Sequence, residues 1–182
     1  FGSNTAICLG DLMVSAAYSA LANASTHYLP EMFTHMHRRV SDVISGQQAD
    51  LALNCISIDQ YNEVARMKSG PLLGLPVELS LIACGLSEQV SIAMAVSDAI
   101  AIAYQTTDDI SDAERDISSG GLNFTALVQG DTASRAHAAR LHASKHAQAA
   151  IKMAKTLPNK AGDGFISLAE KFDPAVEMLE AI

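Results

Sequence analysis

The stretch AMAVSDAIAIAYQTTDDISD, residues 93–112, decides how the rest of the sequence is interpreted. Its first part, residues 93–104, is apolar on nearly all sides, which is typical of a fully buried helix. Its second part is acidic, and on a helix Asp108 and Asp112 lie one turn apart with Asp109 beside them. A buried helix with an acidic end predicts a helical protein whose carboxylates open into a cavity.

Helical patterns continue on both sides of this stretch, and no segment shows the polar–apolar alternation of a strand. Ser57, three residues before Gln60, indicates a helix start, and Gly85 indicates a helix end. We expect Ser69-Gly70-Pro71 to separate one helix from the next. The sequence therefore predicts one all-α domain over residues 1–182, a helical bundle. Its expected helices span about 5–23, 30–54, 58–68, 72–84, 87–116, 132–157 and 160–179.

Composition excludes several classes of protein. Of the 182 residues 49% are apolar and 18% charged, which suits a chain with a sizeable core rather than a disordered one. The net charge of -8 argues against nucleic acid and anionic lipid as partners. The longest apolar run, residues 90–104, is shorter than the roughly 20 residues of a membrane span.

The cysteines indicate the compartment. Cys8, Cys55 and Cys84 are widely spaced and form no CxxC motif, so we expect small buried side chains rather than disulfides or a zinc site. The first residues also lack the basic region of a signal peptide, so we expect none. These features predict a cytoplasmic protein.

The acidic cluster at Asp108, Asp109 and Asp112 has two interpretations. Like charges one turn apart repel each other on a helix, and a bound cation would offset that repulsion. Carboxylate oxygens suit Mg²⁺, which leaves its other positions to water and substrate phosphate. The alternative is a solvated acidic helix end without a ligand. The buried helix that precedes the cluster favours the magnesium site.

Three other patterns are weaker. Lys68 and Ser69 offer a cation and a hydroxyl to phosphate oxygens, although a lysine near a helix end also stabilises the helix dipole. The polar run GQQAD, residues 46–50, interrupts an apolar stripe, so its side chains either satisfy each other or line a cavity. His142 and His146 lie one turn apart without a third ligand, and we expect exposed helix residues there.

In chain order, these motifs resemble the trans-polyprenyl diphosphate synthases, the head-to-tail prenyltransferases. The resemblance rests on Gly10-Asp11, GQxxD at 46–50, Tyr61, Lys68-Ser69-Gly70 and QxxDDxxD at 105–112. It covers nearly the whole chain, with the motifs at similar spacing. It implies the isoprenoid synthase fold and, for the parent protein, condensation of an allylic diphosphate with isopentenyl diphosphate to a polyprenyl diphosphate.

The resemblance also implies roles for individual residues. Asp108, Asp109 and Asp112 match the family's second aspartate-rich motif, which holds Mg²⁺ against the allylic diphosphate. Lys68 matches a lysine that binds this diphosphate, and Ser69 stands where the family usually has threonine. Farnesyl and geranylgeranyl diphosphate are typical products of the family.

Two glutamines and one glycine complete the carried-over positions. Gln105 matches a glutamine beside the reacting carbon, so it is a candidate catalytic residue together with Lys68. Gln47 matches a glutamine that lines the cavity and contacts substrate. A further diphosphate-binding lysine of the family falls near Gly121, where this chain has none. The resemblance also implies homodimers with an early helix at the interface.

The sequence departs from the family in one larger respect. The first aspartate-rich motif and its arginine pair would precede Phe1, and Arg38-Arg39 lies one helix too late to replace that pair. We therefore expect the sequence to correspond to the C-terminal half to two-thirds of such an enzyme and to be inactive alone. The alternative is a non-catalytic subunit with the same fold and a diphosphate-binding cavity. A class I terpene cyclase is a third possibility, against which the pairing of GQxxD with Lys68-Ser69 argues.

Overall fold

A computed structural model describes residues 2–52, 57–119 and 121–173 of the chain. These residues form helices and connecting turns, without a strand. The α-helices are α1 (Ser3–Leu21), α2 (Leu29–Ala52), α3 (Ile58–Ala83), α4 (Val90–Ser119), α5 (Thr132–Ala154) and α6 (Asp163–Lys171). The short 3-10 helices are η1 (Ser87–Gln89), η2 (Phe124–Leu127) and η3 (Pro158–Lys160). The predicted all-α bundle is confirmed.

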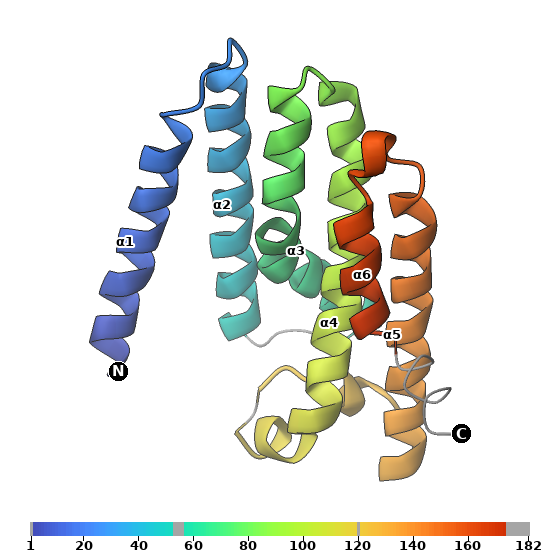
Figure 1. Ribbon diagram of the computed structural model, residues 1–182. Coiled ribbons are helices and arrows are strands. Elements are labelled where there is room, and N and C mark those ends of the chain that lie inside the picture. The colour runs from blue at the N-terminus through green and yellow to red at the C-terminus, as the bar shows by residue number, and fades with distance from the viewer. Residues whose placement is uncertain (1, 53–56, 120, 174–182) are drawn as a thin grey trace.

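Helix α4 is the centre of the bundle, as its apolar sequence predicts. It packs against α3 on one side and α5 on the other, while α6 covers α4 and α5 (Figure 1). Ala93, Val96 and Ile100 have no exposed surface. Helix α5 faces this core with a stripe of fully buried alanines, Ala139, Ala143, Ala147 and Ala150. Small side chains on both helices allow close packing, which leaves the polar end of α4 to project beyond the core.

Helix α3 runs unbroken through Ser69-Gly70-Pro71, so the predicted break is wrong. Pro71 lacks one backbone donor, and a helix bends at such a residue when packing holds both halves in place. Figure 1 shows that α3 changes direction along its length. Ser69, Gly70 and Pro71 are all buried, and a Cβ atom at Gly70 would lie 2.5 Å from the Asp98 carboxylate on α4. Close packing on α4 therefore outweighs the lost hydrogen bond.

Both ends of α3 are capped as the sequence predicts. The Ser57 hydroxyl accepts a hydrogen bond from the backbone nitrogen of Gln60 at 3.2 Å. Gly85 follows the last turn with a φ of 73°, and its backbone nitrogen donates to the Ile82 carbonyl at 2.9 Å. A residue with a side chain would be strained in this left-handed conformation, which is why glycine ends the helix.

Helices α2 and α3 are in backbone contact at Gly46. A Cβ atom at this position would lie only 2.4 Å from the backbone nitrogen of Lys68. Glycine is therefore required for the two helices to lie this close together. The contact brings the last turn of α2, which carries Asp50, beside the middle of α3.

The inner face of α2 is partly charged. Arg39 is 1% exposed and Glu78 of α3 is fully buried, with Arg39 Nε 3.0 Å from a Glu78 carboxylate oxygen. His35 Nε2 lies 2.6 Å from the same oxygen, Glu78 Oε2, and the other oxygen, Oε1, accepts from Arg39 Nη2 at 3.0 Å. Such paired charges satisfy each other inside the core. The apolar stripe predicted for α2 is correct at Met36, which is buried, and wrong at Ile44, which is 63% exposed.

Helix α1 flanks the bundle beside α2 (Figure 1). None of its residues is buried, and Ile7, Leu12 and Met13 are 65%, 64% and 65% exposed. Its strongest side contact is the stacking of Tyr18 on Phe33, with ring centroids 6.1 Å apart. Large apolar side chains of this helix therefore point into solvent in the single chain.

Cys8 on α1 and Cys84 after α3 are exposed, so the prediction of buried cysteines is wrong for both. Cys55 lies outside the described residues, as do the predicted helix ends beyond 52 and 173. Across the described ranges, no helix is long and apolar enough to span a membrane, as the sequence predicts.

Candidate active site

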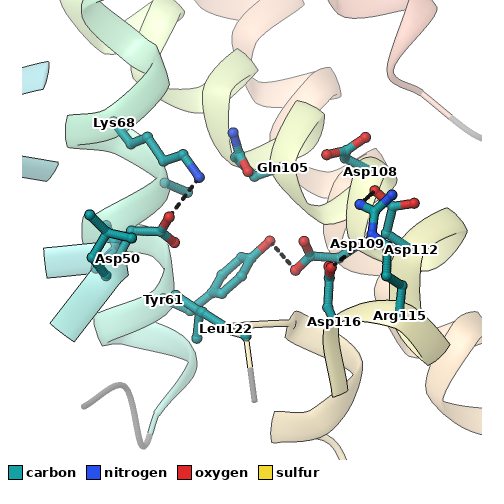
Figure 2. A pocket seen from close by; sticks show the side chains of 14 residues that line it. Asp50, Tyr61, Lys68, Gln105, Asp108, Asp109, Asp112, Arg115, Asp116 and Leu122 are labelled. Carbon is teal, nitrogen blue, oxygen red and sulfur yellow. Dashed lines mark hydrogen bonds and ion pairs between the residues drawn. The ribbon is translucent and has the colours of Figure 1, made fainter. Parts of the chain in front are cut away.

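A cavity of about 340 Å³ opens between the last turn of α2, the first half of α3 and the polar end of α4. Its lining residues are mostly polar. They are Asp50, Leu51, Tyr61, Val64, Ala65, Lys68, Gln105, Asp108, Asp109, Asp112, Arg115, Asp116, Gly121 and Leu122. Figure 2 shows Lys68 on one side of this cavity and the aspartates of α4 on the other. Lys68 and Asp108 therefore face one cavity.

The aspartates of α4 lie at different depths. Asp108 is exposed at the cavity wall. Asp112 is 27% exposed and forms an ion pair with Arg115, whose Nε also lies 3.5 Å from Asp116. Arg115 is 72% exposed, and exposed ion pairs of this kind contribute little to stability. A ligand can therefore displace Arg115 from Asp112 at small cost.

Asp109 is buried and hydrogen-bonded. Its Oδ2 accepts from the Tyr61 hydroxyl at 2.8 Å and from the Phe124 backbone nitrogen at 2.6 Å. Burial raises the pKa of Asp109 to about 6, although these hydrogen bonds act in the opposite direction. Burial and the nearby Asp109 also raise the pKa of the Tyr61 phenol above its ordinary value. Tyr61 therefore remains protonated and donates to Asp109.

The opposite side of the cavity carries a positive charge. Lys68 Nζ lies 2.8 Å from Asp50 Oδ2, and the two side chains are 28% and 22% exposed. Gln105 lines the cavity between this pair and the aspartates, and its amide nitrogen donates to the buried Ser69 hydroxyl at 2.7 Å. This bond occupies the nitrogen of Gln105 and leaves its carbonyl oxygen for a ligand.

The structure brings most of the predicted residues together. Lys68, Gln105, Asp108, Asp109 and Asp112 all line the cavity, and so does Gly121, where the family resemblance places a lysine.

The remaining two predicted residues lie outside that lining. Ser69 is buried behind Gln105 and acts on the cavity through their hydrogen bond. Gln47 is exposed, and its amide donates to Asp50 at 3.4 Å. The structure thus places Gln47 beside the Lys68 partner rather than on the cavity wall.

Tyr61 and Arg115 are site residues to which sequence reasoning gave no role. Tyr61 lies seven positions before Lys68, a spacing that places both on one face of a helix and is a usable signal. The hydrogen bond from the Phe124 backbone nitrogen to Asp109 could not be predicted from the sequence, because it depends on a turn 15 residues after Asp109.

The prediction that His142 and His146 are exposed is wrong, because both are half-buried. The His142 ring stacks on Phe124 with centroids 4.6 Å apart, and its Nε2 lies 2.8 Å from Asn62 Oδ1. Burial, followed by the neighbouring His146 and Lys145, lowers the pKa of His142 to about 4. The two rings pack against each other rather than form a metal site.

The carboxylates fit a magnesium ion only in combination with another ligand. Within residues 2–52, 57–119 and 121–173, no group of three or more His, Cys, Asp or Glu side chains is arranged to hold a metal ion by itself. Asp108 and Asp112 nevertheless present oxygens to one cavity, and Mg²⁺ typically takes one or two protein carboxylates and completes its shell with water and phosphate. The donor set therefore suits Mg²⁺ bound together with a phosphate ligand.

Comparison with known proteins identifies related folds. The polyprenyl synthetase family model matches residues 1–162. A geranylgeranyl pyrophosphate synthetase from the archaeon Geoglobus acetivorans matches with a TM-score of 0.79 and 18% identity, over 94% of this chain and 67% of that one. A polyprenyl synthetase from Streptomyces coelicolor A3(2) matches with a TM-score of 0.70 and 17% identity, over 94% and 67%.

A further crystal structure, described as a geranylgeranyl pyrophosphate synthase, matches with a TM-score of 0.71 and 15% identity, over 94% of this chain and 69% of that one. Among curated protein sequences, none matches the chain. The structural matches confirm the isoprenoid synthase fold that the sequence predicts.

Proposed function

The chain belongs to the polyprenyl synthetase family, and we propose that it serves as a Mg²⁺-dependent prenyltransferase that joins an allylic diphosphate to isopentenyl diphosphate. The observation that carries the proposal is the placement of Lys68 opposite Asp108 and Asp112 across one cavity. The negative oxygens of a diphosphate are stabilised by cationic groups. Aspartates beside the diphosphate would repel it, unless metal ions lie between the aspartates and the diphosphate oxygens.

Departure of diphosphate is the demanding step of such a reaction, because charge develops on the leaving oxygens. Mg²⁺, when bound, neutralises part of that charge. Lys68 provides a further cation from the other side, once it exchanges Asp50 for a phosphate oxygen. Asp108 and Asp112 are the proposed metal ligands, because both face the cavity.

Gln105 is placed to act on the carbon side of the breaking bond. Its amide nitrogen is held by Ser69, so its carbonyl oxygen has a fixed direction beside the cavity. A carbonyl dipole near an allylic cation stabilises the positive charge without capturing it. We therefore assign Gln105 a role at the reacting carbon and Ser69 the role of holding it.

Calorimetry tests this function through binding. The chain is titrated with a non-hydrolysable allylic diphosphate analogue, with and without Mg²⁺. Binding should require both components, and Asp108→Ala should weaken it. Tight binding of Mg²⁺ alone, or binding of the analogue that is indifferent to Mg²⁺ and to Asp108→Ala, would show that the acidic cluster has another role.

We propose further that residues 1–182 expressed alone bind diphosphate but do not elongate a prenyl chain. They hold a single aspartate-rich motif, so the charge on the leaving group is only partly neutralised. Each tenfold loss of rate corresponds to about 1.4 kcal/mol of transition-state stabilisation. The measurement is incorporation of labelled isopentenyl diphosphate with several allylic primers. Elongation by these residues alone would contradict the proposal.

Self-association through α1 is part of the same proposal. The exposed Leu9, Leu12 and Met13 recur at the three-to-four spacing that places them on one side of α1, and a second copy would cover them. Light scattering at micromolar concentration should give a dimer, and Leu12→Glu should shift it toward monomer. A wild-type monomer under these conditions would exclude α1 as a dimer interface. The proposed location remains the cytoplasm.

A further inference from the structure

The acidic motif is divided by its hydrogen bonds. Asp109 is 6% exposed, and one of its oxygens, Oδ2, accepts from both the Tyr61 hydroxyl at 2.8 Å and the Phe124 backbone nitrogen at 2.6 Å. Asp108, in contrast, is exposed at the cavity wall, and Asp112 is 27% exposed and pairs with Arg115. Neighbouring members of one motif thus have different surroundings.

The turn that Asp109 holds is itself well built. Asn123 is 1% exposed, and its amide nitrogen donates to the Asp109 backbone oxygen at 2.9 Å and to Asp116 at 3.3 Å. Its side-chain oxygen accepts from the backbone nitrogen of Thr125 at 2.9 Å and from the Thr125 hydroxyl at 2.6 Å. Both polar atoms of the Asn123 side chain therefore fix the turn, and two of its bonds attach the turn to α4.

Aromatic packing fixes the position of the Tyr61 hydroxyl. The Tyr61 ring is 3% exposed and packs against Phe124 in a T-shaped arrangement, with centroids 5.4 Å apart. Phe124 also stacks on His142, which is hydrogen-bonded to Asn62, the neighbour of Tyr61 on α3. Helices α3, α4 and α5 thus meet at Phe124, and the Tyr61–Asp109 bond lies on the side nearest the cavity (Figure 2).

We infer that Asp109 is a tether rather than a metal ligand, and that Tyr61 is the positioning residue that holds it. The bonds of Asp109 to α3 and η2 fix the rotation of α4 about its axis, so Asp108 and Asp112 point into the cavity before any ligand arrives. This inference rests on the proposed function for its consequence, because it assigns the metal to Asp108 and Asp112. The tether itself can be tested without a ligand.

Amide hydrogen exchange measures the tether directly. Loss of the acceptor in Asp109→Ala should raise the exchange rate of the Phe124 amide about tenfold, as expected for one buried hydrogen bond. Asp109→Asn keeps an acceptor oxygen and should largely restore the protection. Unchanged protection of the Phe124 amide in Asp109→Ala would overturn the inference. If Asp109→Ala does not fold, Asp109→Leu, which keeps the approximate side-chain size but offers no acceptor to the Phe124 amide, allows the same comparison with Asp109→Asn.

Calorimetry with inorganic diphosphate and Mg²⁺ separates tether from ligand. Asp108→Asn is the matched control, because it removes the same charge one position away. Asp108→Asn should weaken binding at least ten times more than Asp109→Asn does. Tyr61→Phe should weaken binding about threefold in the wild-type chain and leave it unchanged in an Asp109→Ala background, since the hydroxyl acts only through Asp109. Equal losses in Asp108→Asn and Asp109→Asn would make Asp109 a ligand and refute the inference.

The two experiments also separate this inference from the proposed function. If wild-type chain does not bind diphosphate with Mg²⁺, the proposed function fails, while the exchange rates still decide whether Asp109 is a tether. If the chain binds diphosphate with Mg²⁺ and the exchange rate of the Phe124 amide is the same with and without the Asp109 carboxylate, the proposed function is retained and the tether is refuted. A general loss of structure would raise exchange along α4 and α5 as well, which the same data reveal.

Discussion

The two sides of the cavity are held in place to very different degrees. On the acidic side, the side chains of Asp109 and Asp116 are bonded to α3 and to the 123–125 turn, and α4 is packed on both flanks. On the lysine side, formed by Asp50 and Lys68, a single half-exposed ion pair of 2.8 Å sets the position of the charge.

This difference separates a preformed surface from an adjustable one. Buried hydrogen bonds hold their groups firmly because breaking one leaves an unsatisfied polar atom. The partly buried Lys68–Asp50 pair holds the lysine through one contact, so Lys68 can exchange Asp50 for another anion without leaving its charge unpaired. The acidic side should therefore determine where a diphosphate binds, and the lysine side should close onto it.

The largest expected effect is on the acidic side. Replacing both proposed ligands in Asp108→Asn/Asp112→Asn should weaken Mg²⁺-dependent binding of inorganic diphosphate at least about 100-fold, since each charged contact contributes about 1.5–3 kcal/mol. Binding without Mg²⁺, which depends on Lys68, should change little. Calorimetry with and without Mg²⁺ measures the loss of affinity in each condition. Equal losses in the two conditions would contradict the proposed division between the acidic side and the lysine side.

Replacement of the lysine should have a smaller effect that does not depend on metal. Lys68→Met should weaken diphosphate binding about tenfold both with and without Mg²⁺, because one charge-assisted contact is lost. Lys68→Arg keeps the charge and should recover part of the affinity. An effect of Lys68→Met seen only with Mg²⁺ would mean that the lysine acts through the metal site.

The support of the acidic side should depend on pH through His142. Its folded-state pKa of about 4 lies below the ordinary value of 6.5, so the unfolded chain takes up a proton first as pH falls. Stability should therefore decrease from pH 6.5 toward pH 4, by about 1 kcal/mol once the partial exposure of the ring is allowed for.

His142→Gln should flatten this pH dependence in urea unfolding measured at pH 7.5 and pH 5. His137→Gln is the matched control, because His137 lies exposed on the same helix. Parallel pH profiles for wild type and His142→Gln would show that another group carries the dependence.

The smallest expected effect concerns the partner of Lys68. Asp50→Asn removes a charge that competes with the ligand for Lys68 and should strengthen metal-free diphosphate binding about threefold. Gln47→Ala tests the other contact of Asp50, and its effect should stay below about twofold because Gln47 is exposed. Weaker binding in Asp50→Asn would show that Asp50 orients Lys68 instead of competing for it.

The parts of the site that follow helical spacing were predictable from the sequence. Asp108 and Asp112 share a face because helix neighbours recur every three to four residues, and the apolar run before them correctly indicated a buried helix. The contact between Tyr61 and Asp109 was not predictable, because it joins residues 48 positions apart.

Errors arose where packing between helices decides the outcome. A proline usually ends a helix, but Pro71 lies in one whose buried face is fixed against α4. The small apolar side chain of Cys8 predicts burial, whereas Cys8 lies exposed on α1. The local sequence indicates whether a segment tends to be helical or buried. Which other helix packs against it depends on the fold of the whole molecule.

The backbone contact at Gly46 sets a dimension of the cavity. Helices α2 and α3, which carry Asp50 and Lys68, lie this close together because position 46 has no side chain. A Cβ atom there would lie 2.4 Å from the Lys68 nitrogen. Gly46→Ala would force α2 and α3 apart and would carry Asp50 away from Lys68. The absence of a Cβ atom at position 46 thus sets how close Asp50 lies to Lys68. A substitution at this position would change the width of the cavity without replacing a residue that lines it.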